Sequence, residues 1–240
     1  MPRTHLTLPP ECLAEGFYTS EVETFDGLPV RTFLPAAYEV NYPYPLLVFF
    51  HGQGGNEEQI LRMAPDVSRR NYVCISLRGP QPLGPGLDGE PGFSWGPDAP
   101  CSTNIEDYVV RAIEQTRRRY HIHSERIYLA GICEGATLAY RLALTFPERF
   151  GGLISLNGIM PRRACPLFRL PALRQLRVLI GHGIANAFAP LTMARKDFML
   201  LYSAGVDIRF RTYPTTHRVH SDMLRDVDRW IQQVIETESE

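Results

Sequence analysis

The order of strand-like and helical segments limits the fold of this chain more than any other feature. From residue 45 onward, short apolar or alternating runs are separated by longer segments of helical character. The run 45–50 (PLLVFF) has no polar side chain, which is typical of a strand buried on both faces. The alternation predicts a largely parallel sheet covered by helices on both faces. Further strands are predicted at 72–77, 126–130, 152–156, 176–181 and 207–213, and helices at 56–70, 103–119, 134–146, 190–204 and 219–237.

Two parts of the chain lie outside this alternation. Residues 17–25 and 29–36 flank an Asp26-Gly27 turn signal, so we expect an antiparallel hairpin at the N-terminal end. Residues 78–102 are rich in glycine and proline and predict one long loop. No linker or repeat divides the 240 residues, a length that suits a single α/β domain over 1–240.

Composition excludes several classes of function. The formal net charge is −1, from 25 basic and 26 acidic side chains, so nucleic acid is not an expected partner. No run approaches the roughly 20 apolar residues of a membrane span. The five cysteines are scattered without a CxxC pair, which argues against a disulfide framework and a zinc site. We therefore expect a cytoplasmic protein without a metal, and the sequence does not indicate its oligomeric state.

The pentapeptide 131–135 (GICEG) lies between a predicted strand and an alanine-rich helix. A nucleophile elbow has the pattern Gly-x-nucleophile-x-Gly, and its nucleophile is usually serine. Here the central residue is Cys133. A thiol at a helix N-terminus is expected to have a lowered pKa, because backbone N–H groups and the helix dipole favour an anion. The alternative is a buried structural cysteine in a glycine-rich turn.

A second motif, 51–55 (HGQGG), follows the strand 45–50. Such a loop fits an oxyanion hole, in which one N–H joins the N–H of the residue after the nucleophile. By position, the two donors are the backbone N–H groups of Gln53 and Glu134. The alternative is an ordinary glycine-rich turn between a strand and a helix.

A base is expected near the thiol, and the order nucleophile, acid, histidine is that of an α/β-hydrolase. His217 follows the last predicted strand and is the candidate base, with His220 as its nearest competitor. The loop where the acid is expected carries Asn186 instead of a carboxylate. If Asn186 is only a turn residue, Asp222 and Glu134 are the carboxylates to consider as partners of the base.

These motifs together resemble the phospholipase/carboxylesterase branch of the α/β-hydrolases, which includes acyl-protein thioesterases. The resemblance implies an α/β-hydrolase fold, with a mostly parallel central sheet, an N-terminal antiparallel hairpin and helices on both faces. It also implies an esterase that needs no cofactor. Carried over by position, Cys133, Asn186 and His217 take the places of nucleophile, acid and base. The matching pieces are VFFHGQGGNE, GFSWGPD, RIYLAGICEGATLAYRLAL, LIGHGIANAFAP and YPTTHRV.

The two departures from the Ser-His-Asp pattern are chemically consistent with each other. A thiolate and an imidazolium can form an ion pair before substrate binds, so the group that orients the histidine need not be charged, as in Cys-His-Asn proteases. We expect the Cys133 sulfur within about 4 Å of a His217 ring nitrogen. The carboxylate of Glu134 would oppose a thiolate unless it faces solvent or pairs with an arginine.

The sequence therefore predicts a hydrolase of carboxylic esters or thioesters with a small to medium acyl group, or an acyltransferase, with a Cys-His-Asn site and an oxyanion hole. Two alternatives stay open. The first is an inactive α/β-hydrolase that binds a ligand or a partner. The second is a relative of dienelactone hydrolases, which also carry cysteine in the elbow.

Three further residues or segments are expected near the substrate. Trp95 and Phe93 lie in the loop 78–102 and are predicted to wall the pocket, although a loop anchored by one buried aromatic is equally consistent. The segment 161–177 contains five arginines and no acid. It is interpreted either as a lid that faces an anionic substrate or as a solvated basic loop.

Overall fold

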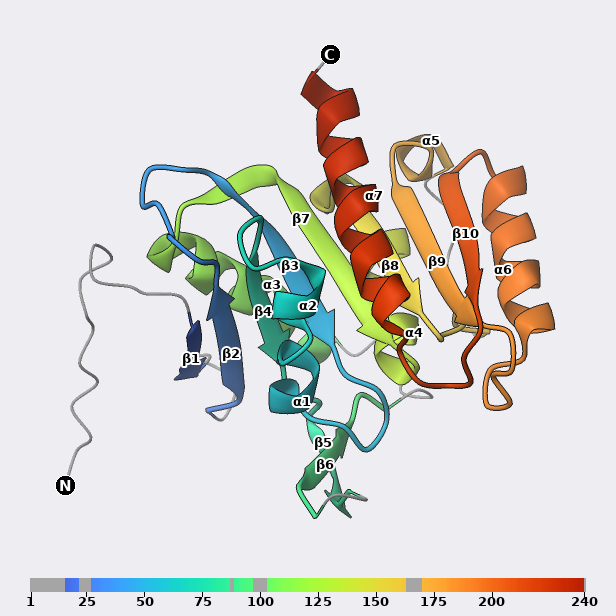
Figure 1. Ribbon diagram of the computed structural model, residues 1–240, viewed down its shortest axis with the longest axis horizontal. Coiled ribbons are helices and arrows are strands. Elements are labelled where there is room, and N and C mark those ends of the chain that lie inside the picture. The colour runs from blue at the N-terminus through green and yellow to red at the C-terminus, as the bar shows by residue number, and fades with distance from the viewer. Residues whose placement is uncertain (1–15, 22–26, 87–88, 97–102, 163–169, 240) are drawn as a thin grey trace.

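The computed structural model describes residues 16–21, 27–86, 89–96, 103–162 and 170–239. Within these ranges, the main element is an eight-stranded sheet (Figure 1). Its strands, in spatial order, are β1 (Gly16–Glu21), β2 (Pro29–Leu34), β4 (Val73–Leu77), β3 (Tyr44–Phe50), β7 (Ile122–Ile132), β8 (Gly152–Leu156), β9 (Arg177–Gly183) and β10 (Asp207–Tyr213).

The sheet is mostly parallel. Strand β2 pairs antiparallel with both β1 and β4, and every pair from β4 to β10 is parallel. The predicted α/β-hydrolase architecture, with its N-terminal antiparallel hairpin, is therefore confirmed. The turn of that hairpin at 22–26 lies outside the described residues.

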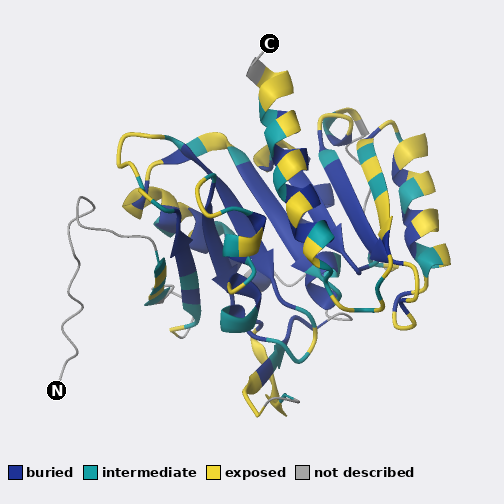
Figure 2. Ribbon diagram, viewed as in Figure 1, coloured by how far each residue is buried: buried dark blue, intermediate teal, exposed yellow. Residues whose placement is uncertain are grey.

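Helices cover both faces of the sheet, and the two faces contain separate hydrophobic clusters. Alternate residues of β3 divide between them, because successive side chains of a strand point to opposite faces: Val48 joins one cluster and Leu47 the other. Figure 2 shows the central strands as the most buried part of the molecule. One face packs against α3 (Thr103–Arg119), α4 (Glu134–Thr145), α5 (Leu170–Leu173) and α6 (Leu191–Ser203), and the other against α1 (Glu57–Leu61), α2 (Ala64–Val67) and α7 (Ser221–Ser239).

The prediction of one long loop at 78–102 was wrong. Part of this segment forms a small antiparallel pair, β5 (Gln81–Pro85) and β6 (Pro91–Ser94). The glycines and prolines of this segment suggested irregular structure. However, the prolines of β5 lie in an exposed strand, and the other residues keep enough backbone N–H groups for the antiparallel pairing of β5 with β6. Residues 97–102 lie outside the described part of the chain.

Asn56 ties helix α1 to strand β6. Its Oδ1 accepts a hydrogen bond from the Gln59 N–H at 2.9 Å, which caps the helix, and its Nδ2 donates to the Pro91 carbonyl at 3.1 Å. We expect Asn56→Ala to lower the free energy of unfolding by about 1–2 kcal/mol, measured by urea denaturation.

Asn56→Asp is the matched control, because a carboxylate keeps the cap and loses only the donor to Pro91. Its loss of stability should be smaller than that of the alanine variant. Equal losses in both variants would show that the helix cap contributes nothing.

Candidate active site

The carboxyl ends of the parallel strands meet at one edge of the sheet and bring together the motifs found in the sequence. Cys133 follows β7, Asn157 follows the neighbouring β8, and His217 lies in the loop after β10. The backbone N–H of Cys133 donates to the Leu156 carbonyl at 3.1 Å, which joins the first two strand ends directly. Ligands of open α/β sheets bind at this edge.

Cys133 occupies a strained turn between β7 and α4. Its backbone has φ 54° and ψ −116°, a conformation that non-glycine residues rarely adopt. The flanking glycines allow it: a Cβ on Gly131 would lie 2.2 Å from the Gly135 carbonyl oxygen, and a Cβ on Gly135 would lie 2.2 Å from the Phe50 carbonyl oxygen. The motif 131–135 therefore has the geometry of a nucleophile elbow.

Two backbone N–H groups face the sulfur of Cys133. They belong to Gln53, in the loop after β3, and to Glu134, the first residue of α4, and both hydrogen bond to the thiol. Strand β6 holds the first of these loops in place: Gly54 N–H donates to the Phe93 carbonyl and Phe93 N–H to the Gly55 carbonyl, each at 2.9 Å. Both N–H groups named from the sequence thus lie beside the sulfur, and their role as an oxyanion hole stays a prediction.

Burial raises the pKa of the Cys133 thiol, and the nearby Glu134 carboxylate raises it further, while the two N–H groups oppose the rise. The expectation of a lowered thiol pKa was therefore wrong. That expectation considered only the helix N-terminus, which lowers the pKa. It omitted the loss of hydration of the buried sulfur, which raises the pKa more.

Glu134 does not face solvent, and no arginine of the described residues forms an ion pair with it. Its side chain is buried, and its Oε1 accepts a hydrogen bond from the Ser94 hydroxyl at 2.7 Å. Its Oε2 is buried without a hydrogen-bond partner. From the sequence we expected this carboxylate to oppose a thiolate unless it faced solvent or paired with an arginine. Among the described residues neither condition is met.

His217 and Asn186 lie in contact. Asn186 Oδ1 is 3.0 Å from His217 Nδ1, and it also accepts the backbone N–H groups of Phe188 and Ala189 at 3.1 Å each. Two backbone donors identify this atom of the amide as the oxygen. Since an oxygen without a proton cannot donate, Nδ1 of His217 carries the hydrogen and Nε2 is free to accept one.

Partial burial lowers the pKa of His217, and the nearby His182 contributes in the same direction. Together with the raised pKa of Cys133, this favours the neutral thiol and neutral imidazole over the ion pair that the sequence suggested. The approach of the Cys133 sulfur to Nε2 of His217 stays a prediction.

The alternative partners for the base lie elsewhere. Asp222 forms an ion pair with Arg225 at the start of α7, and its backbone N–H donates to Nδ1 of His220 at 3.2 Å. The hydrogen bond from the Arg225 side chain lowers the pKa of Asp222. Neither Asp222 nor Glu134 replaces Asn186 beside the ring of His217.

Trp95 anchors the segment that follows β6. It is 2% exposed, and its indole N–H donates to the His51 carbonyl at 3.0 Å. This burial favours the anchoring interpretation that the sequence left open. Phe93 is partly buried, with the Arg78 guanidinium 4.6 Å from the centre of its ring.

Sequence reasoning missed Asn157, which is fully buried at the end of β8 with φ 53°. Its side chain contacts the loops of both His217 and Asn186. The available signal was an Asn-Gly pair directly after a predicted strand, at the edge where site residues gather.

Two of the described arginines of 161–177 form ion pairs with acidic side chains of the protein. Arg162 forms an ion pair with the buried Asp197 at 2.9 Å, and Arg177 pairs with Glu238. Both contacts favour a structural role over a substrate-facing one. Residues 163–169 of this segment lie outside the described residues, so the lid interpretation stays a prediction there.

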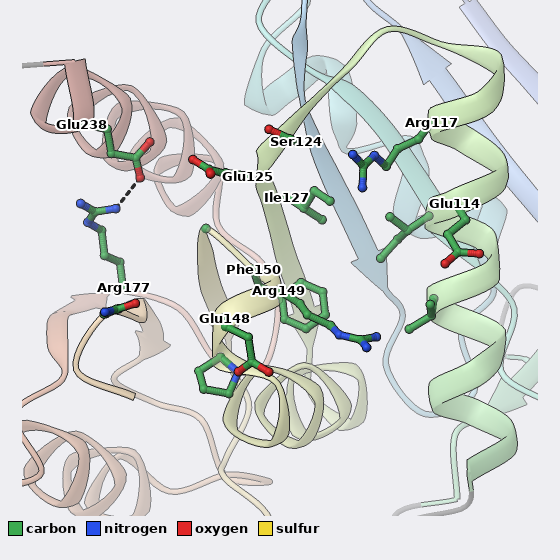
Figure 3. A pocket seen from close by; sticks show the side chains of 15 residues that line it. Glu114, Arg117, Ser124, Glu125, Ile127, Glu148, Arg149, Phe150, Arg177 and Glu238 are labelled. Atoms are coloured by element: carbon green, nitrogen blue, oxygen red, sulfur yellow. Dashed lines mark hydrogen bonds and ion pairs between the residues drawn. The ribbon is translucent and has the colours of Figure 1, made fainter. Parts of the chain in front are cut away.

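A cavity of about 600 Å³ lies at the opposite, amino edge of the sheet. Figure 3 shows charged side chains around it, among them Arg117 of α3 and the ion pair between Arg177 and Glu238. Since Cys133 lies at the carboxyl end of β7, this cavity is separate from the candidate active site.

Two kinds of feature are absent from the described residues. In this part of the chain, His, Cys, Asp and Glu side chains nowhere form a group of three suited to a metal ion. None of the described helices has both the length and the apolar character needed to cross a bilayer.

Comparison with known proteins gives the family. The model of the phospholipase/carboxylesterase family matches residues 40–235. The chain belongs to the phospholipase/carboxylesterase family. A probable carboxylesterase of Oryza sativa subsp. japonica is 22% identical over 206 residues, which cover 79% of this chain and 88% of that protein.

Acyl-protein thioesterase 1 of Mycosarcoma maydis is 29% identical over 48% of this chain and 51% of its own length. The chain thus spans about half the length of this relative, and 46% of a second probable carboxylesterase of Oryza sativa subsp. japonica. Among solved structures, a carboxylesterase of Mesorhizobium loti has a TM-score of 0.69 at 19% identity, with 92% of this chain and 99% of that chain covered. This likeness shows the fold.

The close packing at the elbow generates a test of stability. We expect Gly135→Ala to lower the free energy of unfolding by about 3 kcal/mol or more, because its Cβ would collide with the carbonyl of Phe50 on β3. Urea denaturation measures the change. Gly84→Ala is the control: no atom lies within 4 Å of its Cβ, and its φ of 86° costs an alanine only about 1–2 kcal/mol. Similar losses in the two variants would contradict the close approach.

Proposed function

We propose that this protein hydrolyses small carboxylic esters or thioesters, or transfers their acyl groups, with Cys133 as nucleophile. His217 is the general base, Asn186 orients it, and the N–H groups of Gln53 and Glu134 stabilise the oxyanion. One observation carries the proposal: two backbone donors from different elements converge on the sulfur of a cysteine held in a strained elbow. The reaction needs no cofactor.

The neutral resting state determines how the nucleophile is activated. Nε2 of His217 accepts the thiol proton as sulfur attacks the carbonyl carbon, and the former carbonyl oxygen becomes the oxyanion that Gln53 and Glu134 bind. The imidazolium then gives its proton to the leaving alcohol or thiol, which leaves an acyl thioester on Cys133. Water, or another acceptor, attacks that thioester with His217 again as the base and regenerates the thiol.

Asn186 acts in this scheme as a neutral acceptor for Nδ1–H. It holds the ring in the productive tautomer but supplies no charge to stabilise the imidazolium. In a Ser-His-Asp protease, replacing the aspartate by asparagine lowers turnover about 10⁴-fold. A thiol ionises more readily than a serine hydroxyl, so the loss should be smaller with cysteine.

A second candidate function is binding without turnover. The raised pKa of Cys133, the buried carboxylate of Glu134 and the amide of Asn186 all disfavour a charged catalytic pair. Under this alternative the same edge of the sheet binds an ester-like ligand or a partner. A dienelactone-hydrolase-like activity is the further alternative that the cysteine elbow leaves open.

Variants at two positions separate these candidates. We expect Cys133→Ser to lose most turnover of a short nitrophenyl ester, because a serine proton must be removed without a charged acid behind His217. Asn186→Asp should leave the cysteine enzyme within about tenfold of wild type, roughly 1.4 kcal/mol in barrier. The double variant should exceed Cys133→Ser alone, since the base and the acid act as a unit.

Wild type serves as the reference for all three variants. Turnover by Cys133→Ser equal to that of wild type would contradict a mechanism that depends on the thiol. Four inactive proteins, tested against varied esters and thioesters, would favour the binding protein.

The pKa directions predict separate pH profiles for turnover and for alkylation. Neutral His217 is the active form, and its pKa is lowered from an ordinary value of about 6.5. Turnover should therefore rise with pH, with the midpoint of the rise below about pH 6.5. Iodoacetamide needs the thiolate, so its reaction with Cys133 should still accelerate above about pH 8.5, because the thiol pKa is raised.

Mass spectrometry of the Cys133 peptide gives the alkylation rate, and the buried Cys74 serves as an internal control. An alkylation rate that is already constant between about pH 5 and pH 8 would instead indicate a pre-formed ion pair.

A further inference from the structure

Asn157 uses every hydrogen-bonding group of its side chain within the candidate active site. Its Nδ2 donates to the backbone carbonyls of His217 and Arg218 at 3.1 and 3.0 Å. Its Oδ1 accepts the Gly183 N–H at 2.8 Å and faces Nδ2 of Asn186 at 3.5 Å. Its own backbone N–H donates to the Gly181 carbonyl at 2.9 Å.

These contacts join the two loops that carry the base and its partner. The carbonyls of His217 and Arg218 belong to the loop after β10, whereas Gly183 and Asn186 lie at the end of β9 and in the loop after it. Asn157 itself follows β8, and its neighbour Leu156 accepts the backbone N–H of Cys133. One buried side chain therefore connects the strand end beside the nucleophile with the loops that hold the base.

The same contacts determine where the oxygen and the NH₂ group point in the side-chain amides of Asn157 and Asn186. Backbone carbonyls accept only, so the atom of Asn157 that faces them is the NH₂ group, and the other atom is an acceptor. Asn186 must then turn its NH₂ toward Asn157 and its oxygen toward Phe188, Ala189 and His217. Nδ1 of His217 consequently carries the hydrogen.

This matters because Asn186 has replaced a carboxylate. A carboxylate has two equivalent oxygens and accepts from Nδ1–H in either orientation. An amide turned by 180° would present NH₂ to Nδ1, which would move the ring hydrogen to Nε2 and remove the lone pair that accepts the thiol proton. A site with asparagine in this position thus needs contacts that select one orientation. The N–H groups of Phe188 and Ala189 select it on the oxygen side of Asn186, and Asn157 is the partner on the NH₂ side.

We propose that Asn157 is a positioning residue that joins the two loops and, together with the N–H groups of Phe188 and Ala189, selects the tautomer of His217 through Asn186. The proposal rests on the proposed function for its consequence in turnover, but its geometric content can be tested without turnover. Asn157 touches neither the sulfur nor the substrate in this scheme, and it acts only through Asn186 and the loop of His217.

The first test is the ring tautomer of His217, read from imidazole ¹⁵N chemical shifts near pH 8, where the ring is neutral. In the wild type, we expect hydrogen on Nδ1. In Asn157→Gly, which keeps the positive φ without strain, we expect a mixture of both tautomers. A wild-type ring with hydrogen on Nε2, or an unchanged tautomer in the variant, would overturn the proposal.

The second test is kinetic. Asn157→Gly should lower kcat for a short nitrophenyl ester about 100-fold with less than a threefold change in KM, as expected for a misplaced catalytic group. In an Asn186→Asp background the same substitution should cost only about tenfold, because the carboxylate has no orientation to select. Equal losses in both backgrounds would leave Asn157 a purely structural residue and overturn the proposal.

Asn71→Gly is the matched control. Its side-chain amide also donates to a side chain far along the chain, the carboxylate of Asp228, but away from the site residues. We expect it to lose stability without a change in kcat or in the tautomer of His217. An inactive wild type whose His217 still carries hydrogen on Nδ1, with the tautomer disturbed in Asn157→Gly, would refute the proposed function and support the role of Asn157.

Discussion

Strand β7 and helix α4 meet so closely that no side-chain atom fits between the backbones at the turn. The glycines at 131 and 135 accept this approach, and the residue between them is forced into a positive φ. The sulfur of Cys133 is thereby pushed out of the sheet and toward the loop after β3. The burial of the thiol and its contacts with the N–H groups of Gln53 and Glu134 both follow from this close approach.

Burial at this crossing decides the chemistry. The loops that bring Gln53 and Glu134 to the sulfur also remove water from it, and the loss of hydration raises the pKa of Cys133 more than the N–H groups lower it. The Glu134 carboxylate adds to the rise. The raised pKa favours a thiol that is protonated at rest, and in the proposed mechanism this thiol, like a serine hydroxyl, needs His217 as a base. An amide in place of the acid is compatible with such a state only when its orientation is fixed.

Local signals made much of the fold and part of the site predictable. The parallel sheet was predictable from the alternation of strand-like and helical segments. The elbow was predictable from its two glycines, because the turn brings backbones too close for a Cβ at either position. The β5–β6 pair was missed because it is held by hydrogen bonds between Phe93 and the loop at Gly54 and Gly55, which lies far away in the sequence. The pKa of Cys133 was predicted with the wrong sign because burial depends on what packs over the sulfur. Asn157 was missed because its role exists only between loops that are separate in sequence.

The most direct measurement is the identification of an acyl group on the protein. A short nitrophenyl ester or thioester would be mixed with the wild type, quenched in acid before turnover is complete, and the digested protein examined by mass spectrometry. The account predicts an acyl thioester on the peptide that contains Cys133 and no such adduct in Cys133→Ser under the same conditions. Ester turnover by the wild type with the acyl group on another residue, or with the same turnover after Cys133 is blocked, would contradict it.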